Sequence, residues 1–303
     1  MFIHTHTAIN MKTYRYLLSI LFLSLVALSS RAYELAAFHC DEDTTLINSL
    51  LASPELKELP SGDRVSFFAR KLVGSPSSLR SEILEADTMQ FTVNAHTFTP
   101  LSFISTCIAL AQAYETSSSP NWRDFADRFE NVMFKKGEAS DFVSRFLYPS
   151  DWIADNIFRG NVQDITANLD GISPRKKEKS IDYISHHKES FKAFENPKNY
   201  DRLKMLEMGF RNHQIPYISN GDLTNPNRFK PQAKEGDIFF LLAPDFNLDC
   251  REMGILTKEG DRLLIIQLSP SKDSVTMEEL PFEQYVKRNV KRIQGARIVR
   301  IAK

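Results

Sequence analysis

Residues 234–269 read KEGDIFFLLAPDFNLDCREMGILTKEGDRLLIIQLS, and this stretch decides the fold class. Three apolar runs, at 236–243, 251–257 and 262–269, are separated by residues that favour turns. Short apolar runs between turn signals are typical of strands in an antiparallel sheet or a small barrel. The runs at 273–277 and 296–302 continue the pattern, so the last seventy residues or so are predicted to form this β-structure.

The chain before this stretch has the periodicity of helices. Residues 99–114 give the clearest pattern, since Leu101, Ile104, Ile108 and Ala111 fall on one stripe. Similar spacing predicts helices over 61–72, 122–134, 179–194 and 200–213. Because helices come first and strands later, the sequence predicts an α+β fold in which N-terminal helices pack on a C-terminal antiparallel sheet or small barrel.

The N-terminus has the three parts of a secretory signal peptide. Lys12 and Arg15 precede the apolar run 17–28, and Ser30-Arg31-Ala32 is a small-x-small cleavage site. The apolar run is shorter than the roughly 20 residues of a membrane-spanning helix. We therefore expect residues 1–32 to be cleaved, with Met11 as the true start, leaving 33–303 as a single exported domain, periplasmic or extracellular, without a transmembrane segment.

Charge and motifs exclude several classes of function. Lys plus Arg and Asp plus Glu are equal at 38 each, so no overall charge indicates nucleic-acid binding. The basic C-terminal segment ends in a period-two run, 296–301, which predicts a strand with solvated arginines rather than a nucleic-acid arm. No HExxH or paired CxxC motif is present, so neither a metal site nor a cofactor is expected.

Three segments together resemble one family, the N-acetylmuramoyl-L-alanine amidase-like proteins, which are exported bacterial cell-wall enzymes with a papain-like, NlpC-type core. RVSFFARKLVGSP (64–76) is similar to that family's helix before a Gly-Thr-Pro-Tyr turn. RFLYPSDWIADNIFRGNVQDIT (145–166) is similar to its Tyr-x-Ser-Asp-Trp-Ile-x-x-Asn segment. Residues 234–269 resemble its strand pair that carries the catalytic histidine. The order and spacing of the segments carry the resemblance, which extends from about residue 62 to the C-terminus.

The resemblance also implies which residues stand at the catalytic positions. In active members a Val-Asn stretch leads into Asp-Cys-Thr-Thr-Phe at a helix start, and here Val93-Asn94 leads without a gap to Thr99-Pro100. The nucleophilic cysteine is thus replaced by Pro100. The base histidine of Ser-His-Val-Gly-Ile becomes Glu252, and the group that orients it becomes Gln267. Proline has neither a nucleophile nor an N–H, but it suits the first turn of a helix behind a Thr99 N-cap.

These replacements imply a family member without hydrolytic activity, which binds peptidoglycan stem peptides or an envelope partner. Thr99, Glu252 and Gln267 are expected to line a polar cleft, with Pro100 near Glu252. Trp152, Asp155 and Asn156 match the family's most distinctive segment and are expected to shape the substrate side. Core packing is the alternative for Trp152, since tryptophans near helix starts are often buried.

Other interpretations stay open at this point. The first is an active hydrolase with a rearranged site, in which Ser102 or His96 acts with Glu252. The second is an exported binding protein unrelated to this family. Three cysteines remain after cleavage of the signal peptide, and either Cys107 pairs with Cys250 in a disulfide or both are buried free thiols, while Cys40 is expected to carry no lipid.

Overall fold

Helices form most of the first half of the chain in the computed structural model, which describes residues 37–38, 42–86, 92–269 and 271–302. The main helices here are α2 (Glu42–Leu51), α3 (Ser61–Lys71), α4 (Pro100–Thr116), α5 (Trp122–Met133) and α6 (Pro149–Phe158). Shorter turns lie between them, at Pro54–Glu58, Arg80–Leu84 (η3), Lys135–Gly137 and Phe142–Ser144, with the short strands β1 (Ala37–Phe38) and β2 (Thr92–Val93). The predicted signal peptide, residues 1–32, and Cys40 lie outside the described residues.

The second half contributes the sheet. Its strands are β3 (Val162–Asp164), β4 (Arg175–Lys179), β5 (His213–Ser219), β6 (Ile238–Leu242), β7 (Cys250–Glu259), β8 (Arg262–Ser269), β9 (Ser274–Met277) and β10 (Gly295–Ile301). Within the described residues these eight strands pair antiparallel in the order β4-β5-β10-β6-β7-β8-β9, with β3 added on β10. Since β4 and β9 end the order without pairing to each other, the sheet is open. The α+β prediction is confirmed, and its small-barrel variant is wrong.

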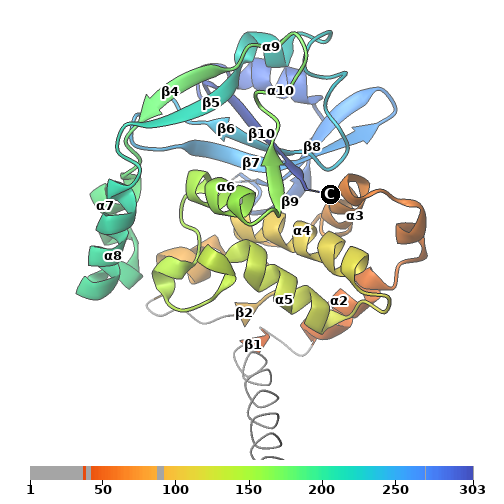
Figure 1. Ribbon diagram of the computed structural model, residues 1–303, viewed down its shortest axis with the longest axis horizontal. Coiled ribbons are helices and arrows are strands. Elements are labelled where there is room, and N and C mark those ends of the chain that lie inside the picture. The colour runs from red at the N-terminus through yellow and green to blue at the C-terminus, as the bar shows by residue number, and fades with distance from the viewer. Residues whose placement is uncertain (1–36, 39–41, 87–91, 270, 303) are drawn as a thin grey trace, which may run out of the picture. The chain divides into compact units, whose positions relative to one another are not determined.

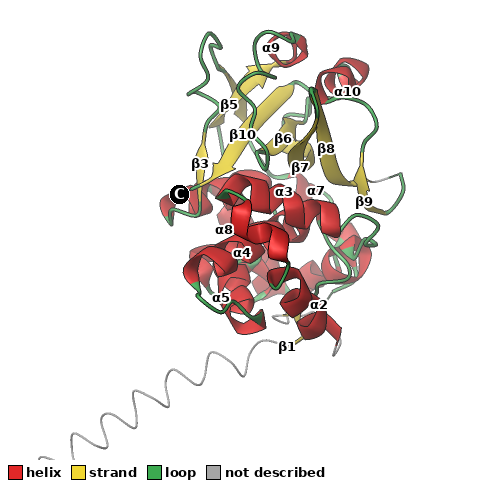
Figure 2. Ribbon diagram, turned by 90° about the vertical axis from the view of Figure 1, so that its right-hand side faces the viewer, coloured by secondary structure: helices red, strands yellow, loops and turns green. Residues whose placement is uncertain are grey.

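The two faces of the sheet are covered by different helices. Figures 1 and 2 show α3, α4 and α6 on one side, and α9 (Asn220–Thr224) and α10 (Phe282–Asn289) on the other. On the first side, hereafter the α4 face, the ring of Phe240 in β6 lies 5.8 Å from that of Trp152 in α6. On the second side, the α10 face, the next residue, Leu241, joins a buried cluster with Phe282 of α10. This is the alternation of side chains expected along a strand.

The segment 179–194 departs from the sequence prediction. In place of one helix it holds the end of β4, α7 (Tyr183–His186) and two 3₁₀ turns, Lys188–Ser190 and Lys192–Glu195. Lys179 is fully buried in β4, and its ammonium group donates to the carbonyls of Ala243 (2.7 Å), Leu248 (2.7 Å) and Asp245. Tertiary hydrogen bonds thus override the helical pattern here. The predicted helix over 200–213 is present as α8 (Pro197–Met208).

The arginines of the last strand are also not solvated as predicted. Arg297 is buried and its guanidinium lies 2.6 Å from Asp164 of β3. Arg300 pairs at 2.6 Å with Asp237, whose side chain is fully buried. β10 lies between β5 and β6 with β3 added on it, and the two carboxylates come from β3 and from the residue directly before β6. None of the helices in the described ranges is both long and apolar enough to cross a membrane.

Candidate functional site

The start of α4 is a closed capping box. Thr99 is the N-cap, Pro100 is the first helical residue, and the Thr99 hydroxyl accepts from the Ser102 amide at 3.1 Å. The Ser102 hydroxyl in turn accepts from the Thr99 amide at 2.8 Å and lies 3.2 Å from the Thr99 carbonyl, to which it donates. Both hydroxyls are buried and engaged in the cap, which is the pattern that stabilises a helix N-terminus.

A hollow of about 330 Å³ lies in front of this helix start, and Pro100 is half-buried in its wall. Three of its lining residues are polar in character: Thr99, Asp249 and Cys250. The others are apolar or aromatic: Leu79, Ile83, Leu84, Pro100, Leu101, Phe146, Leu147, Tyr148, Pro149, Tyr183, Ile184, Phe191, Leu248 and Met253. The place where the resemblance puts a nucleophile is therefore an apolar hollow without a histidine, lysine or arginine in its lining.

The side-chain oxygens of Asp249 and Tyr148 at the hollow are bonded to the protein itself. The Asp249 carboxylate accepts from the amides of Ser150 (2.7 Å) and Cys250 (2.8 Å), and burial raises its pKa above the ordinary 3.8. The Tyr148 hydroxyl donates to Glu207 (2.8 Å) and accepts from the Ile184 amide (2.7 Å). These residues, which sequence reasoning missed, support the wall rather than offer free groups to a ligand.

Neither described cysteine is activated or paired. Cys107 and Cys250 are free buried thiols, and burial raises the pKa of each well above the ordinary 9.0. Of the two alternatives that the sequence left open, the disulfide between them is not present and the pair of buried free thiols is confirmed. Cys250 lies at the hollow beside Pro100, whereas Cys107 lies two helical turns, about 10 Å, further along α4. A disulfide needs Cα atoms within about 7 Å.

Glu252 and Gln267 meet on the α10 face of the sheet, away from α4. The Tyr285 hydroxyl of α10 donates to Glu252 (2.5 Å) and accepts from the Gln267 amide (3.0 Å). Glu252 is paired in register with Leu241, whose side chain belongs to the α10 face, and directly opposed residues share a face. Burial, with the Glu252 bond second, raises the pKa of Tyr285. No sequence pattern pointed to Tyr285, which lies ten residues before the start of β10.

A β-bulge explains why Cys250 and Glu252 do not share a face. Between Leu241 and Leu242 of β6 the register on β7 jumps from Glu252 to Cys250, so Arg251 is an extra residue. A bulge of this kind reverses the alternation of side chains. Cys250 therefore turns to the α4 face and lines the hollow with Met253, while Glu252 turns to the α10 face. Alternation alone predicts a shared face, and that prediction is wrong.

The predicted polar cleft is consequently divided between two faces. Thr99 lies at the hollow with Pro100 and Ser102 lies behind it in the cap, whereas Glu252 and Gln267 lie across the sheet. α4 does pack against β7 and β8, as predicted, but the β7 residues that line the hollow with Pro100 are Cys250 and Met253, not Glu252.

His96 is held by α2. Its Nδ1 lies 2.8 Å from the carboxylate of Asp43, which is fully buried and also accepts from the Ala95 amide at 2.8 Å. This contact ties the loop before α4 to the first described helix. It places His96 with α2 and not with Glu252, which lies on the α10 face.

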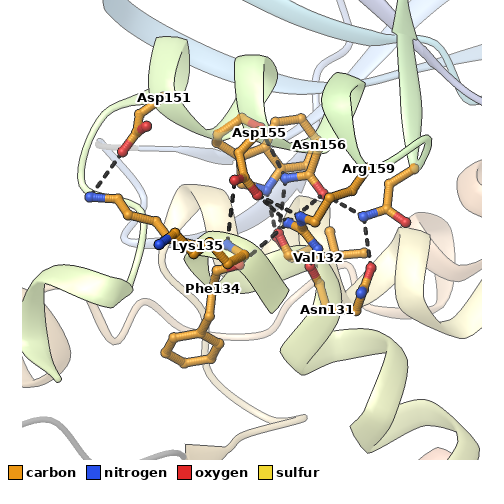
Figure 3. A network of polar contacts seen from close by, with 12 residues as sticks. Asn131, Val132, Phe134, Lys135, Asp151, Asp155, Asn156 and Arg159 are labelled. Atoms are coloured by element: carbon orange, nitrogen blue, oxygen red, sulfur yellow. Dashed lines mark hydrogen bonds and ion pairs between the residues drawn. The ribbon is translucent and has the colours of Figure 1, made fainter. Parts of the chain in front are cut away.

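The α6 segment is a buried polar junction. Trp152 is fully buried, and its Nε1 donates to Ser105 of α4 at 3.2 Å. Asn156, also fully buried, donates from Nδ2 to the carbonyls of Val132 (3.0 Å) and Trp152 (2.9 Å). Figure 3 shows this network joining α6 to the end of α5.

Two further groups complete the junction. The Asn156 oxygen accepts from Asn161 at 2.9 Å, and Arg159 donates to Asp155 at 2.6 Å and to the Asn131 carbonyl. Trp152 is thus a core residue, in agreement with the packing alternative. Trp152 and Asn156 lie in the interior, and Asp155 is half-buried in its ion pair, so none of the three lines the hollow.

Comparisons with known proteins agree with the resemblance. The sequence profile of the AmiA-like family, described as N-acetylmuramoyl-L-alanine amidase-like, matches residues 68–293. Among proteins with curated descriptions, no match to this sequence was found.

Two solved structures are similar over most of the chain. A crystal structure of an N-acetylmuramoyl-L-alanine amidase from Bacteroides uniformis has a TM-score of 0.71 and 25% sequence identity, covering 80% of this chain and 99% of that one. A Legionella pneumophila protein assigned to the DUF1460 family model has a TM-score of 0.66 and 20% identity, covering 87% and 95%. The second likeness concerns the fold alone.

Proposed function

The chain belongs to the AmiA-like family of N-acetylmuramoyl-L-alanine amidase-like proteins, and from this premise we propose that it is an exported member that binds its ligand without hydrolysing it. In this proposal the helices and the sheet correspond to a papain-like, NlpC-type core. Pro100, Glu252 and Gln267 stand at the positions of the nucleophile, the base and the orienting group.

The observation that carries the proposal is Pro100 at the first position of α4, facing a hollow whose lining contains no histidine. Cysteine-type hydrolysis needs a thiolate, a histidine that takes its proton, and amides that hold the oxyanion. Proline supplies neither the thiolate nor the amide. The cap itself is intact, so the helix start keeps its structural role without those groups.

The rearranged hydrolase finds less support in the same geometry. A serine nucleophile needs a base within hydrogen-bond reach, about 2.6–3.2 Å. The Ser102 hydroxyl bonds to Thr99 on both sides, and Glu252 bonds to Tyr285 across the sheet. His96 bonds to Asp43. No two of these three candidates are brought together.

The ligand in this proposal is a peptide, either a peptidoglycan stem peptide or a segment of an envelope protein. The test uses the purified protein from Tyr33 onward with a set of defined muropeptides, with cleavage followed by mass spectrometry and binding by calorimetry in the same samples. Binding without a cleavage product is the expected result. A cleavage product that disappears in Ser102→Ala would overturn the proposal in favour of the rearranged hydrolase.

A further inference from the structure

The hollow at the start of α4 differs in chemistry from a site for charged peptides. We propose that it binds an uncharged apolar side chain of a peptide partner, an inference that rests on the proposed binding function and specifies its ligand. The wall that a ligand meets includes Leu79, Ile83, Leu101, Tyr183 and Met253. Apolar groups that enter such a wall leave water, which is favourable by about 25 cal/mol per Å².

Its size suits one large or two small side chains. At about 330 Å³ it is roughly twice the ~150 Å³ of an apolar cavity that holds one benzene molecule. It lies at the lower end of the range for small-ligand pockets, ~300–1,000 Å³. An aromatic side chain with a neighbouring methyl group would therefore fill it, whereas a bare polypeptide backbone would not.

Charge selects against an acidic ligand. The lining contains no basic side chain, and its one acidic residue, Asp249, is already satisfied by two amides. Thr99 is used in the cap. A carboxylate of a stem peptide would lose its hydration here without gaining an ion pair with a basic side chain of the lining, which is costly for a charged group. An uncharged apolar side chain avoids that loss.

The wall is held in place before any ligand arrives. The turn η3 carries Ile83 and Leu84, and its Glu82 forms an ion pair at 2.6 Å with Arg145, which is buried beside the hollow's Phe146. Leu79, directly before η3, leaves 40% of its surface exposed at the rim. A fixed apolar wall with an exposed apolar rim needs little ordering on binding, so more of the burial energy contributes to affinity.

The test compares three capped probes on the same purified protein with ¹³C-labelled methyl groups: acetyl-Ala-Phe-Ala-amide, acetyl-Ala-Glu-Ala-amide and a muropeptide. Methyl NMR titrations report both affinity and position. We expect the phenylalanine probe to shift the methyl signals of Met253 and Ile83. We also expect it to bind at least about tenfold more tightly than the glutamate probe, as burial of one large apolar side chain implies.

A matched pair of variants locates the site. Leu79→Glu places a charge at the rim and should weaken the phenylalanine probe by about tenfold. Val73→Glu changes a similarly exposed apolar residue, 44% against 40%, that does not line the hollow, and should leave binding unchanged. Equal binding of the two capped tripeptides, or equal loss in both variants, would overturn the inference. If Leu79→Glu does not fold, the comparison of probes on the unaltered protein still tests it.

The same samples separate this inference from the proposed function. Mass spectrometry that finds a cleaved phenylalanine probe would overturn the absence of hydrolysis but leave the apolar preference standing. A muropeptide that shifts the Met253 and Ile83 signals, while the phenylalanine probe does not, would overturn the apolar preference and leave binding without hydrolysis standing.

Discussion

The α6 junction and the start of α4 both lie in parts of the chain that resemble the family. They differ in what is ordered there: buried side-chain hydrogen bonds in the first region, and the backbone of a helix start in the second. At the junction the side chains of Trp152, Asn156 and Arg159 are buried or partly buried and bonded to neighbouring helices. At the start of α4 a capping box holds the backbone, and the first helical position, which faces the hollow, is a proline. In the proposed function, the groups that support the fold match the family, whereas the groups that would perform chemistry differ from it.

The difference follows from what each group contributes to stability. Removal of one partner from a buried hydrogen-bonded network leaves others unsatisfied, at about 1–3 kcal/mol for each group. The first residue of a helix has no such constraint, because its N–H has no partner within the helix. Replacement of a nucleophile there costs the fold little, and Pro100 is well suited to that position. Measurements on the two regions test this contrast.

The largest effect is expected from Trp152→Ala. It removes a fully buried ring against Phe240 and the bond to Ser105, so the free energy of unfolding should fall by about 3–5 kcal/mol. Urea unfolding followed by circular dichroism measures it. Phe158→Ala on the same helix is the control, since that ring is 90% exposed and should change stability by less than about 0.5 kcal/mol. Equal losses would contradict the packing role of Trp152.

Asn156→Ala should rank second, with a loss of about 2–3 kcal/mol. The carbonyls of Val132 and Trp152 would lose a donor in the interior. Asp155→Asn, one residue earlier and half-buried, weakens the ion pair with Arg159 and the long bond from the Lys136 amide (3.4 Å), and should cost less. The same urea experiments measure both. A smaller loss for Asn156→Ala than for Asp155→Asn would show that the network is not what holds α6 to α5.

Ser102→Ala should cost about 1 kcal/mol, as the loss of a helix cap does. Thr99→Ala removes the other half of the same box and should cost a similar amount. Because the two hydroxyls act together, the double variant should lose less than the sum of the single losses. Thermal or urea unfolding of the three variants measures this coupling, and full additivity would contradict the reciprocal cap.

Pro100→Cys should have the smallest effect on stability and the clearest effect on chemistry. A thiol at a helix N-terminus has a lowered pKa and reacts readily as a thiolate. Iodoacetamide at neutral pH should therefore label position 100 quickly, while Cys107 and Cys250, buried with raised pKa values, stay unlabelled in the folded protein. Peptide mapping by mass spectrometry identifies the labelled site.

The same variant also tests the missing base. The lining of the hollow contains no histidine, so the new cysteine should not cleave muropeptides although it is reactive. Measurable cleavage by Pro100→Cys would mean that a base approaches the hollow from elsewhere. That outcome would sharpen the contrast by showing that only the nucleophile has been replaced.

Local patterns in the sequence predicted much of the fold. The periodic apolar residues of 99–114 and the short apolar runs of 234–269 correspond to α4 and to β6, β7 and β8. Their signals are strong because the residues of one face are all buried. The strands β4 and β5 were missed, since β4 reads RKKEK and β5 contains a proline. β4 pairs with β5 at the edge of the sheet. The buried ammonium of Lys179 in β4 donates to carbonyls more than sixty residues further along the chain, and a local pattern cannot show such contacts.

By itself, the sequence determined the α+β class, the helix that begins at Thr99-Pro100 and the absence of a cysteine at its start, because each depends on residues close together in the chain. Only the tertiary structure decided which side chains share a face. A single extra residue, Arg251, places Cys250 on the face of Met253 and the hollow, while Glu252 lies on the opposite face with Tyr285. Side-chain alternation is counted residue by residue, so an unseen bulge reverses it, and the bulge exists only through pairing with β6.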